Sequence, residues 1–83
     1  MSSIKSRIES LLFISAKPMA ASQLADLLKA DKKDIIKSAD ELLADYKTAQ
    51  AGVQVIKDGS KYQMVSAPEN AKVIQEFIKD ETT

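Results

Sequence analysis

The sequence predicts a small domain that is mainly α-helical with one β-hairpin, an α+β fold in the order helix, helix, helix, hairpin, helix. Apolar residues recur at helical spacing up to Thr48, and the spacing then changes to strand-like alternation. An Asp-Gly pair separates two alternating runs, which is a strong hairpin signal. With 83 residues, of which 45% are apolar, the chain has enough material for one small core.

The first helix is expected over about residues 3–15. Its apolar stripe falls at helical spacing, on Ile4, Ile8, Leu11 and Leu12. Either Ser3 or Ser6 is placed to cap it. Phe13 and Ile14 lie off the stripe, so this helix is either buried on several sides or has a second contact surface at these residues.

Two further helices follow the break at Pro18. The second is expected over about residues 21–30 and lacks a good cap, because Ala20 stands where Ser, Thr or Asp is preferred. The third begins at Asp31, whose side chain suits a cap. Its apolar stripe covers three turns: Ile35, Ile36, Ala39, Leu42, Leu43 and Tyr46. Two helices joined by so short a connection predict a helix-turn-helix.

The strands of the hairpin are expected at residues 53–57 and 61–65, joined by the Asp-Gly pair, in which both residues tolerate positive φ. A two-stranded ribbon is marginal in water, so one of its faces has to pack on the helices. Val53 and Val55 share one face of the first strand, and Tyr62 and Met64 share one face of the second. This leaves Ile56 and Val65 on the opposite faces, where we expect partial exposure.

The last helix begins near Pro68, which suits a first helical position. Its apolar face carries Val73, Ile74, Phe77 and Ile78, and residues 79–83 form a polar tail without structure signals. A helix-turn-helix followed by a hairpin is a winged helix-turn-helix, here with an added C-terminal helix. That helix either folds back over the core or leaves its apolar face exposed.

The amino-acid composition excludes most kinds of catalytic and metal-binding site. The chain has no Cys and no His, which removes zinc ligands, a cysteine nucleophile and an imidazole base. Its two glycines cannot form a phosphate-binding loop, and its carboxylates alternate with lysines as on solvated helix faces. We therefore expect no enzyme activity, no catalytic residue, no cofactor and no metal. Because no apolar run approaches the roughly 20 residues that span a bilayer, we expect a cytoplasmic protein without membrane contact.

A winged helix raises the alternative of a DNA-binding transcription regulator. Between residues 20 and 47, however, five lysines stand against six acidic residues. The third helix has no Arg, Asn or Gln for bidentate contacts to bases. DNA-binding domains usually concentrate positive charge on one face. We expect no sequence-specific binding of nucleic acid, and the DNA-binding regulator stays as the alternative function.

Protein–protein interaction is the function class that remains. A chain of this length buries only about 60–65% of its unfolded surface, so association is a natural additional source of stability. The first helix, the ribbon and the last helix carry more apolar residues than a three-helix core needs. The candidate interface residues are Phe13, Ile14, Ile56, Val65 and Phe77, and the expected partner is a second copy of the chain, in a homodimer.

Two stretches of the chain resemble a known family. Residues 8–19, Ile-Glu-Ser-Leu-Leu-Phe-Ile-Ser-Ala-Lys-Pro-Met, with the leucine-rich stretch after them, resemble the opening of segregation and condensation protein B. Residues 59–69, Gly-Ser-Lys-Tyr-Gln-Met-Val-Ser-Ala-Pro-Glu, resemble the wing of that family. The similarity spans almost the whole chain. Two departures, Ala-Lys in place of Gly-Glu at residues 16–17 and Ala20 in place of a capping Ser or Thr, affect a turn and a cap.

The resemblance implies a non-enzymatic protein of two tandem winged-helix domains, of which residues 1–83 would be the first. It implies a homodimer formed chiefly through this domain, and a role in chromosome segregation and condensation, in the cytoplasm and associated with the nucleoid. The implied partner is the kleisin subunit, segregation and condensation protein A, which bridges the heads of the structural-maintenance-of-chromosomes ATPase. The resemblance attributes the kleisin contacts largely to the second domain.

Overall fold

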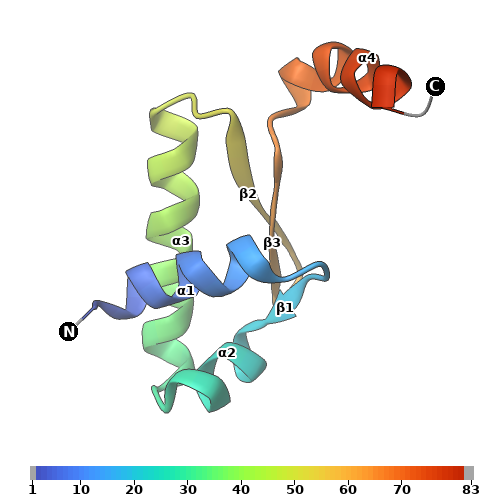
Figure 1. Ribbon diagram of the computed structural model, residues 1–83. Coiled ribbons are helices and arrows are strands. Elements are labelled where there is room, and N and C mark those ends of the chain that lie inside the picture. The colour runs from blue at the N-terminus through green and yellow to red at the C-terminus, as the bar shows by residue number, and fades with distance from the viewer. Residues whose placement is uncertain (1, 82–83) are drawn as a thin grey trace.

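The computed structural model describes residues 2–81 and has the predicted winged helix-turn-helix (Figure 1). We call the fold without its last helix the body. The helices of the body are α1 (Ile4–Ile14), α2 (Ala21–Leu28) and α3 (Lys32–Thr48). The strands are β1 (Met19–Ala20), β2 (Val53–Asp58) and β3 (Lys61–Ser66). A 3₁₀ turn (Pro68–Asn70) then leads into α4 (Ala71–Glu81). The expected order of three helices, hairpin and helix is confirmed.

The helix beginnings follow the residues beside them. Ser3 caps α1, because its Oγ accepts a hydrogen bond from the backbone N–H of Ser6 at 3.1 Å, which decides between the two serines. α2 starts after Ala20 without a side-chain cap, as expected. Asp31 occupies the N-cap position of α3, but its side chain makes no capping hydrogen bond, so this expectation is wrong. The first turn of α3 is exposed, where water satisfies its free N–H groups.

A third strand joins the hairpin. β1 pairs antiparallel with β3, with Met19 opposite Tyr62, and the sheet has the order β1-β3-β2. Two residues are too few to show an alternating pattern, so the sequence did not reveal this strand.

The hairpin turn lies one residue later than predicted. Asp58 pairs with Lys61, so the two central residues are Gly59 and Ser60, and Asp58 belongs to the strand. Gly59 has a φ of 63°. A glycine with positive φ at the first central position is typical of a type II′ turn, in which the second residue does not need positive φ.

The core lies where α1, α2 and α3 meet one face of the sheet. Its helical members are Ile8, Leu12, Ala21, Leu24, Ile35, Ala39 and Leu42. From the strands it receives Met19, Val55 and Tyr62, with Met64 half-buried beside them. The predicted packing of the face that carries Val55 and Tyr62 is confirmed.

α4 extends away from this core (Figure 1). It contacts mainly the 3₁₀ turn before it. The radius of gyration is 14.2 Å, whereas a compact domain of this length has about 12 Å. The last helix therefore does not fold back over the core. The predicted polar tail is helical as far as Glu81, and its residues 82–83 lie outside the described part of the chain.

A polar cluster fastens the ribbon to α3. The hydroxyl of Tyr62 donates to Oδ1 of Asp40 at 2.8 Å. Lys57 Nζ lies 3.2 Å from the same oxygen and 5.4 Å from the centre of the Tyr62 ring. Burial first, and then the hydrogen bond to Asp40, raise the pKa of Tyr62 above its ordinary value. The fold therefore stabilises the neutral phenol.

We predict that Tyr62→Phe lowers the free energy of unfolding at neutral pH by about 1 kcal/mol, because one partly buried hydrogen bond is lost. A group whose pKa is raised on folding stabilises the protein below its unfolded pKa, and this contribution is lost as the pH rises through the folded pKa. The variant should therefore lose less stability than the unsubstituted chain between about pH 9 and about pH 11. Urea denaturation at several pH values measures both effects, and an unchanged alkaline decline would contradict the assignment.

Candidate protein-interaction surface

α1 turns its last residues away from the core. Ile8 and Leu12 are buried, whereas Phe13 and Ile14 are 77% and 78% exposed. Successive residues of a helix are about 100° apart, so the positions directly after Leu12 leave the buried stripe. Of the two alternatives for these residues, exposure on a second surface is the one observed.

A hollow of about 340 Å³ opens beside Phe13. It lies between α1, α3 and the ribbon. Its lining consists of Glu9, Ser10, Phe13, Tyr46, Val53 and Met64. Val53 and Met64 belong to the inner face of the ribbon, on which Val55 is buried by the helices. The hollow therefore marks the place where the helices stop covering this face.

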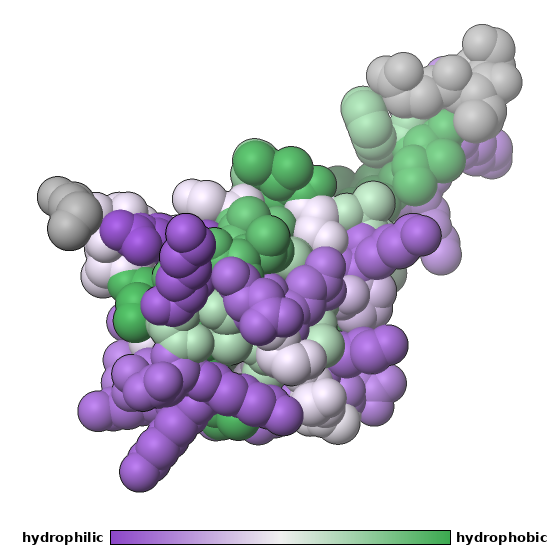
Figure 2. Space-filling view, turned by 90° about the horizontal axis from the view of Figure 1, so that it is seen from below, coloured by the Kyte–Doolittle hydropathy of each residue, from purple (hydrophilic) through white to green (hydrophobic). Residues whose placement is uncertain are grey.

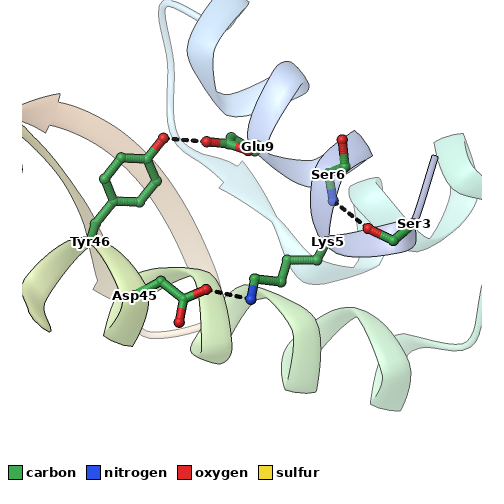
Figure 3. Close-up of polar contacts among 6 residues, drawn as sticks. All are labelled: Ser3, Lys5, Ser6, Glu9, Asp45 and Tyr46. Carbon is green, nitrogen blue, oxygen red and sulfur yellow. Dashed lines mark hydrogen bonds and ion pairs between the residues drawn. The ribbon is translucent and has the colours of Figure 1, made fainter. Parts of the chain in front are cut away.

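Two polar contacts tie α1 to α3 (Figure 3), and the residues of one of them, Glu9 and Tyr46, line this hollow. The hydroxyl of Tyr46 donates to the carboxylate of Glu9, and Lys5 pairs with Asp45. The hydrogen bond to Glu9, with burial as a smaller cause, raises the pKa of Tyr46 above its ordinary value. These contacts hold Glu9 and Tyr46 in place as walls of the hollow, and they are built into the monomer.

α4 presents a second apolar surface. Val73, Phe77 and Ile78 are 67%, 60% and 52% exposed. Val73 and Phe77 lie one turn apart on the same side of the helix, and Ile78 lies about 100° further round it. The base of this segment is fixed, because Ala67 is fully buried and its N–H donates to the carbonyl of Gly52 at 2.8 Å. Figure 2 shows hydrophobic surface on the body and again on the projecting helix.

Ile56 and Val65 lie on the other face of the ribbon. In the β2–β3 register, Gln54 stands opposite Val65 and Ile56 opposite Gln63, and these positions alternate with the buried Val55. Ile56 is 44% exposed and Val65 is half-buried, which agrees with the predicted partial exposure. Next to Val65, the side-chain amide of Gln54 donates to the carbonyls of Tyr46 and Ala51 and covers part of this face.

The five predicted interface residues therefore do not form one patch. Phe13 and Ile14 lie at the end of α1, Phe77 lies on α4, and the pair Ile56 and Val65 lies on the outer face of the ribbon. Val73 and Ile78 of the same predicted apolar face are exposed as well, Val73 one turn before Phe77 and Ile78 directly after it.

We predict that Phe13→Ser changes the free energy of unfolding of the monomer by no more than about 0.5 kcal/mol, because an exposed side chain gains little from folding. Leu12→Ala, one residue earlier, should cost about 2–5 kcal/mol, because it leaves a cavity in the core. Urea denaturation at low protein concentration measures both variants. Equal losses for the two would show that Phe13 belongs to the core.

The helix-turn-helix has no excess of positive charge, because five lysines stand against six acidic residues between residues 20 and 47. Asp40 on α3 is paired with Lys57 of the wing, and Asp45 is paired with Lys5 of α1, so acidic groups lie on the helix that reads DNA in other winged helices. The charge balance expected from the sequence is thus carried into the fold. Electrostatic capture of a phosphate backbone needs an excess of cations, which this surface lacks.

We predict that the chain binds double-stranded DNA no more tightly than the non-specific range of about 10⁻⁴–10⁻⁶ M at physiological salt. Fluorescence anisotropy with duplexes of different sequence measures this. Tight binding that selects one sequence would contradict the prediction and favour a transcription regulator.

Residues 2–81 contain neither a cluster of potential metal ligands nor a membrane-spanning helix. Nowhere in this range do three or more acidic residues gather to hold a metal ion. Within the same range, no helix has the length and apolar character to cross a membrane.

Comparison with known proteins gives one consistent family. The family model of the segregation and condensation complex subunit ScpB matches residues 6–83. Segregation and condensation protein B of Clostridium perfringens (strain SM101 / Type A) is 32% identical over 77 residues, which are 92% of this chain and 40% of that protein. The same protein of Clostridium tetani is 28% identical over 72 residues, or 87% of this chain and 38% of the relative. The chain thus spans about two fifths of the curated relatives that it matches.

Two solved structures share the fold. ScpB from Mycobacterium tuberculosis has a TM-score of 0.91 at 15% identity, covering 96% of this chain and 50% of that one. A dimer of the ScpB N-terminal domain complexed with ScpA peptide has a TM-score of 0.80 at 23% identity, covering 88% of this chain and 91% of that one. The resemblance of the two sequence stretches is confirmed, since the family model covers nearly all of the chain: the chain belongs to the segregation and condensation complex subunit ScpB family.

Proposed function

We propose that this chain is a non-enzymatic interaction module of a bacterial chromosome segregation and condensation complex. It pairs with a second copy and supports the binding of the kleisin subunit, segregation and condensation protein A, to the structural-maintenance-of-chromosomes ATPase. The observation that carries the proposal is the exposed apolar surface of Phe13, Ile14 and the α4 side of Phe77 on a domain whose core is otherwise well buried. Exposed apolar surface of this kind is typical of interaction sites.

The solved relatives support both partners. One of them is a dimer of the ScpB N-terminal domain complexed with ScpA peptide, and its fold covers most of this chain. That complex favours a kleisin contact on the N-terminal domain itself, in addition to the second-domain contacts that the family resemblance implies. Because this chain matches about two fifths of its curated relatives, we assign it to the first of two tandem domains.

The remaining parts of the proposal follow from the surface chemistry. A site for acid–base or nucleophilic catalysis needs groups held together in a cleft. The tyrosines and carboxylates that interact here do so in contacts that fasten helices and ribbon. We place the protein in the cytoplasm, associated with the nucleoid through the ATPase complex. The alternative, a DNA-binding transcription regulator, has no excess of positive charge on the helix-turn-helix to support it.

We predict a concentration-dependent monomer–dimer equilibrium, with the dimer weakened about tenfold or more by Phe13→Asp or by Phe77→Asp, because a buried charge in an apolar contact is costly. Sedimentation velocity over a concentration series measures the dissociation constant. Ile56→Asp tests whether the outer face of the ribbon takes part. If that variant keeps both fold and association, Ile56 and its neighbour Val65 leave the interface.

Leu27→Asp is the matched control. Leu27 is a 56% exposed apolar residue of α2, on a different part of the body, so its substitution adds the same charge away from the proposed surface. It should leave the dissociation constant unchanged. A chain that stays monomeric at hundreds of micromolar would overturn the homodimer. If Leu27→Asp and Phe13→Asp weaken self-association equally, Phe13 is not assigned to the dimer interface.

A further inference from the structure

The outer edge of β3 is only half paired. Backbone groups along a strand point alternately to its two sides, and two backbone hydrogen bonds show which residues of β3 point to which side. The N–H of Ala67 bonds to Gly52 on the β2 side, and the carbonyl of Ser60 accepts from Ala21 on the β1 side. Even-numbered residues of β3 therefore direct their N–H and C=O groups away from β2. Tyr62 meets Met19 of β1 there, whereas Met64 and Ser66 have no partner strand within the described residues.

The chain turns its own backbone away from this edge. If β1 extended backwards in register, Lys17 would come opposite Met64. Instead, the N–H of Lys17 donates to Oγ of Ser15 at 3.2 Å, and the carbonyl of Lys17 accepts from the same hydroxyl at 2.6 Å. The next residue is Pro18, which has no N–H to donate. Both backbone groups that would pair with Met64 are thus engaged locally, and the edge stays open.

Apolar surface lies directly beside the open edge. The residue paired with Met64 on an added strand would point to the same face as the Met64 side chain. That face holds the hollow of about 340 Å³ that Phe13, Val53 and Met64 help to line. An extended segment at this edge would therefore gain backbone hydrogen bonds and bury one side chain.

We propose that Met64 and Ser66 bind an extended peptide segment as an added strand of the sheet, with an apolar residue of the peptide in the hollow beside Phe13. This inference rests on the proposed function, because we take the segment to belong to the kleisin. A short peptide fits better than a second copy of this chain. The open part of β3 is about four residues, or roughly 14 Å long, so a strand added there buries far less than the about 800 Å² per partner of a stable protein–protein interface.

Ser66→Pro tests the backbone contact. Ser66 is exposed, its N–H points away from β2, and Val65 before it is already extended, so proline removes one outward donor and leaves the hairpin ladder intact. Ser66→Ala is the matched control, because it removes the hydroxyl and keeps the N–H. Calorimetry measures how tightly the unsubstituted chain, Ser66→Pro and Ser66→Ala bind purified segregation and condensation protein A from the same source. The same measurement is made with overlapping short peptides that together cover its sequence.

We expect Ser66→Pro to weaken binding about tenfold, since it removes one hydrogen bond and blocks the approach of a strand, and Ser66→Ala to change it less than about twofold. Equal binding by Ser66→Pro and the unsubstituted chain would overturn the edge site and leave the proposed function standing. If Ser66→Pro loses self-association but still binds the kleisin, the peptide site at the edge is also overturned, in favour of pairing between two copies of this chain. If the unsubstituted chain binds no part of the kleisin, both the proposed kleisin contact and this inference fail.

Amide hydrogen exchange on the unsubstituted chain gives a second measurement that needs no variant. The N–H of Met64 should exchange rapidly in the free chain and slow down when the binding peptide is added. The N–H of Val65 points to β2 and should be protected in both states, which makes it the internal reference. A Met64 amide whose exchange does not respond to saturating peptide would overturn the added strand.

Discussion

The fold depends on covering one face of the β-ribbon. Two strands alone are marginal in water, and here Tyr62 and Val55 bury the inner face against the helices. Tyr62 contributes more than apolar area, because its hydroxyl is bonded to Asp40 of α3 and Lys57 lies over its ring. The side chain that fills the core therefore also fixes the wing against α3. α1 and α2 also pack on α3, so α3 is the element at which the three helices and the ribbon meet.

The helices cover only part of the inner face of the ribbon, and the candidate sites lie beside the uncovered part. α1 stops at Ile14, and the segment after it is held by the hydroxyl of Ser15 before the chain reaches the two-residue strand β1. Among residues 2–81, no further helix lies over Val53 and Met64, because α4 is directed away from the helices and ribbon. The hollow, the exposed Phe13 and the unpaired edge of β3 thus share one cause, which is that the helices cover only part of the ribbon.

The periodicity of apolar residues predicted the helices, the hairpin strands and much of the core. It did not predict features that depend on local hydrogen bonds. The stripe of α3 and the alternation of the strands predicted which side chains would be buried, because burial follows helical and strand spacing. The turn shifted by one residue since only Gly59 needs positive φ, and spacing does not show which of two positions it takes. β1 and the open edge depend on Ser15 engaging the backbone of Lys17, a contact between neighbours that carries no periodic signal. The candidate surface was predicted residue by residue, but its division over three places required the fold.

We expect association of this domain to be coupled to the stability of α4. α4 has 11 residues and rests mainly on a 3₁₀ turn, and helices of that length are marginal in water without packing on one face. A partner that covers Val73, Phe77 and Ile78 supplies the packing that the core does not give. With a net charge of zero, the chain has little long-range steering to bring that partner in. Apolar burial and backbone pairing, both of which act only on contact, must then provide the affinity, and this favours partners that are tethered or held at high local concentration within one complex.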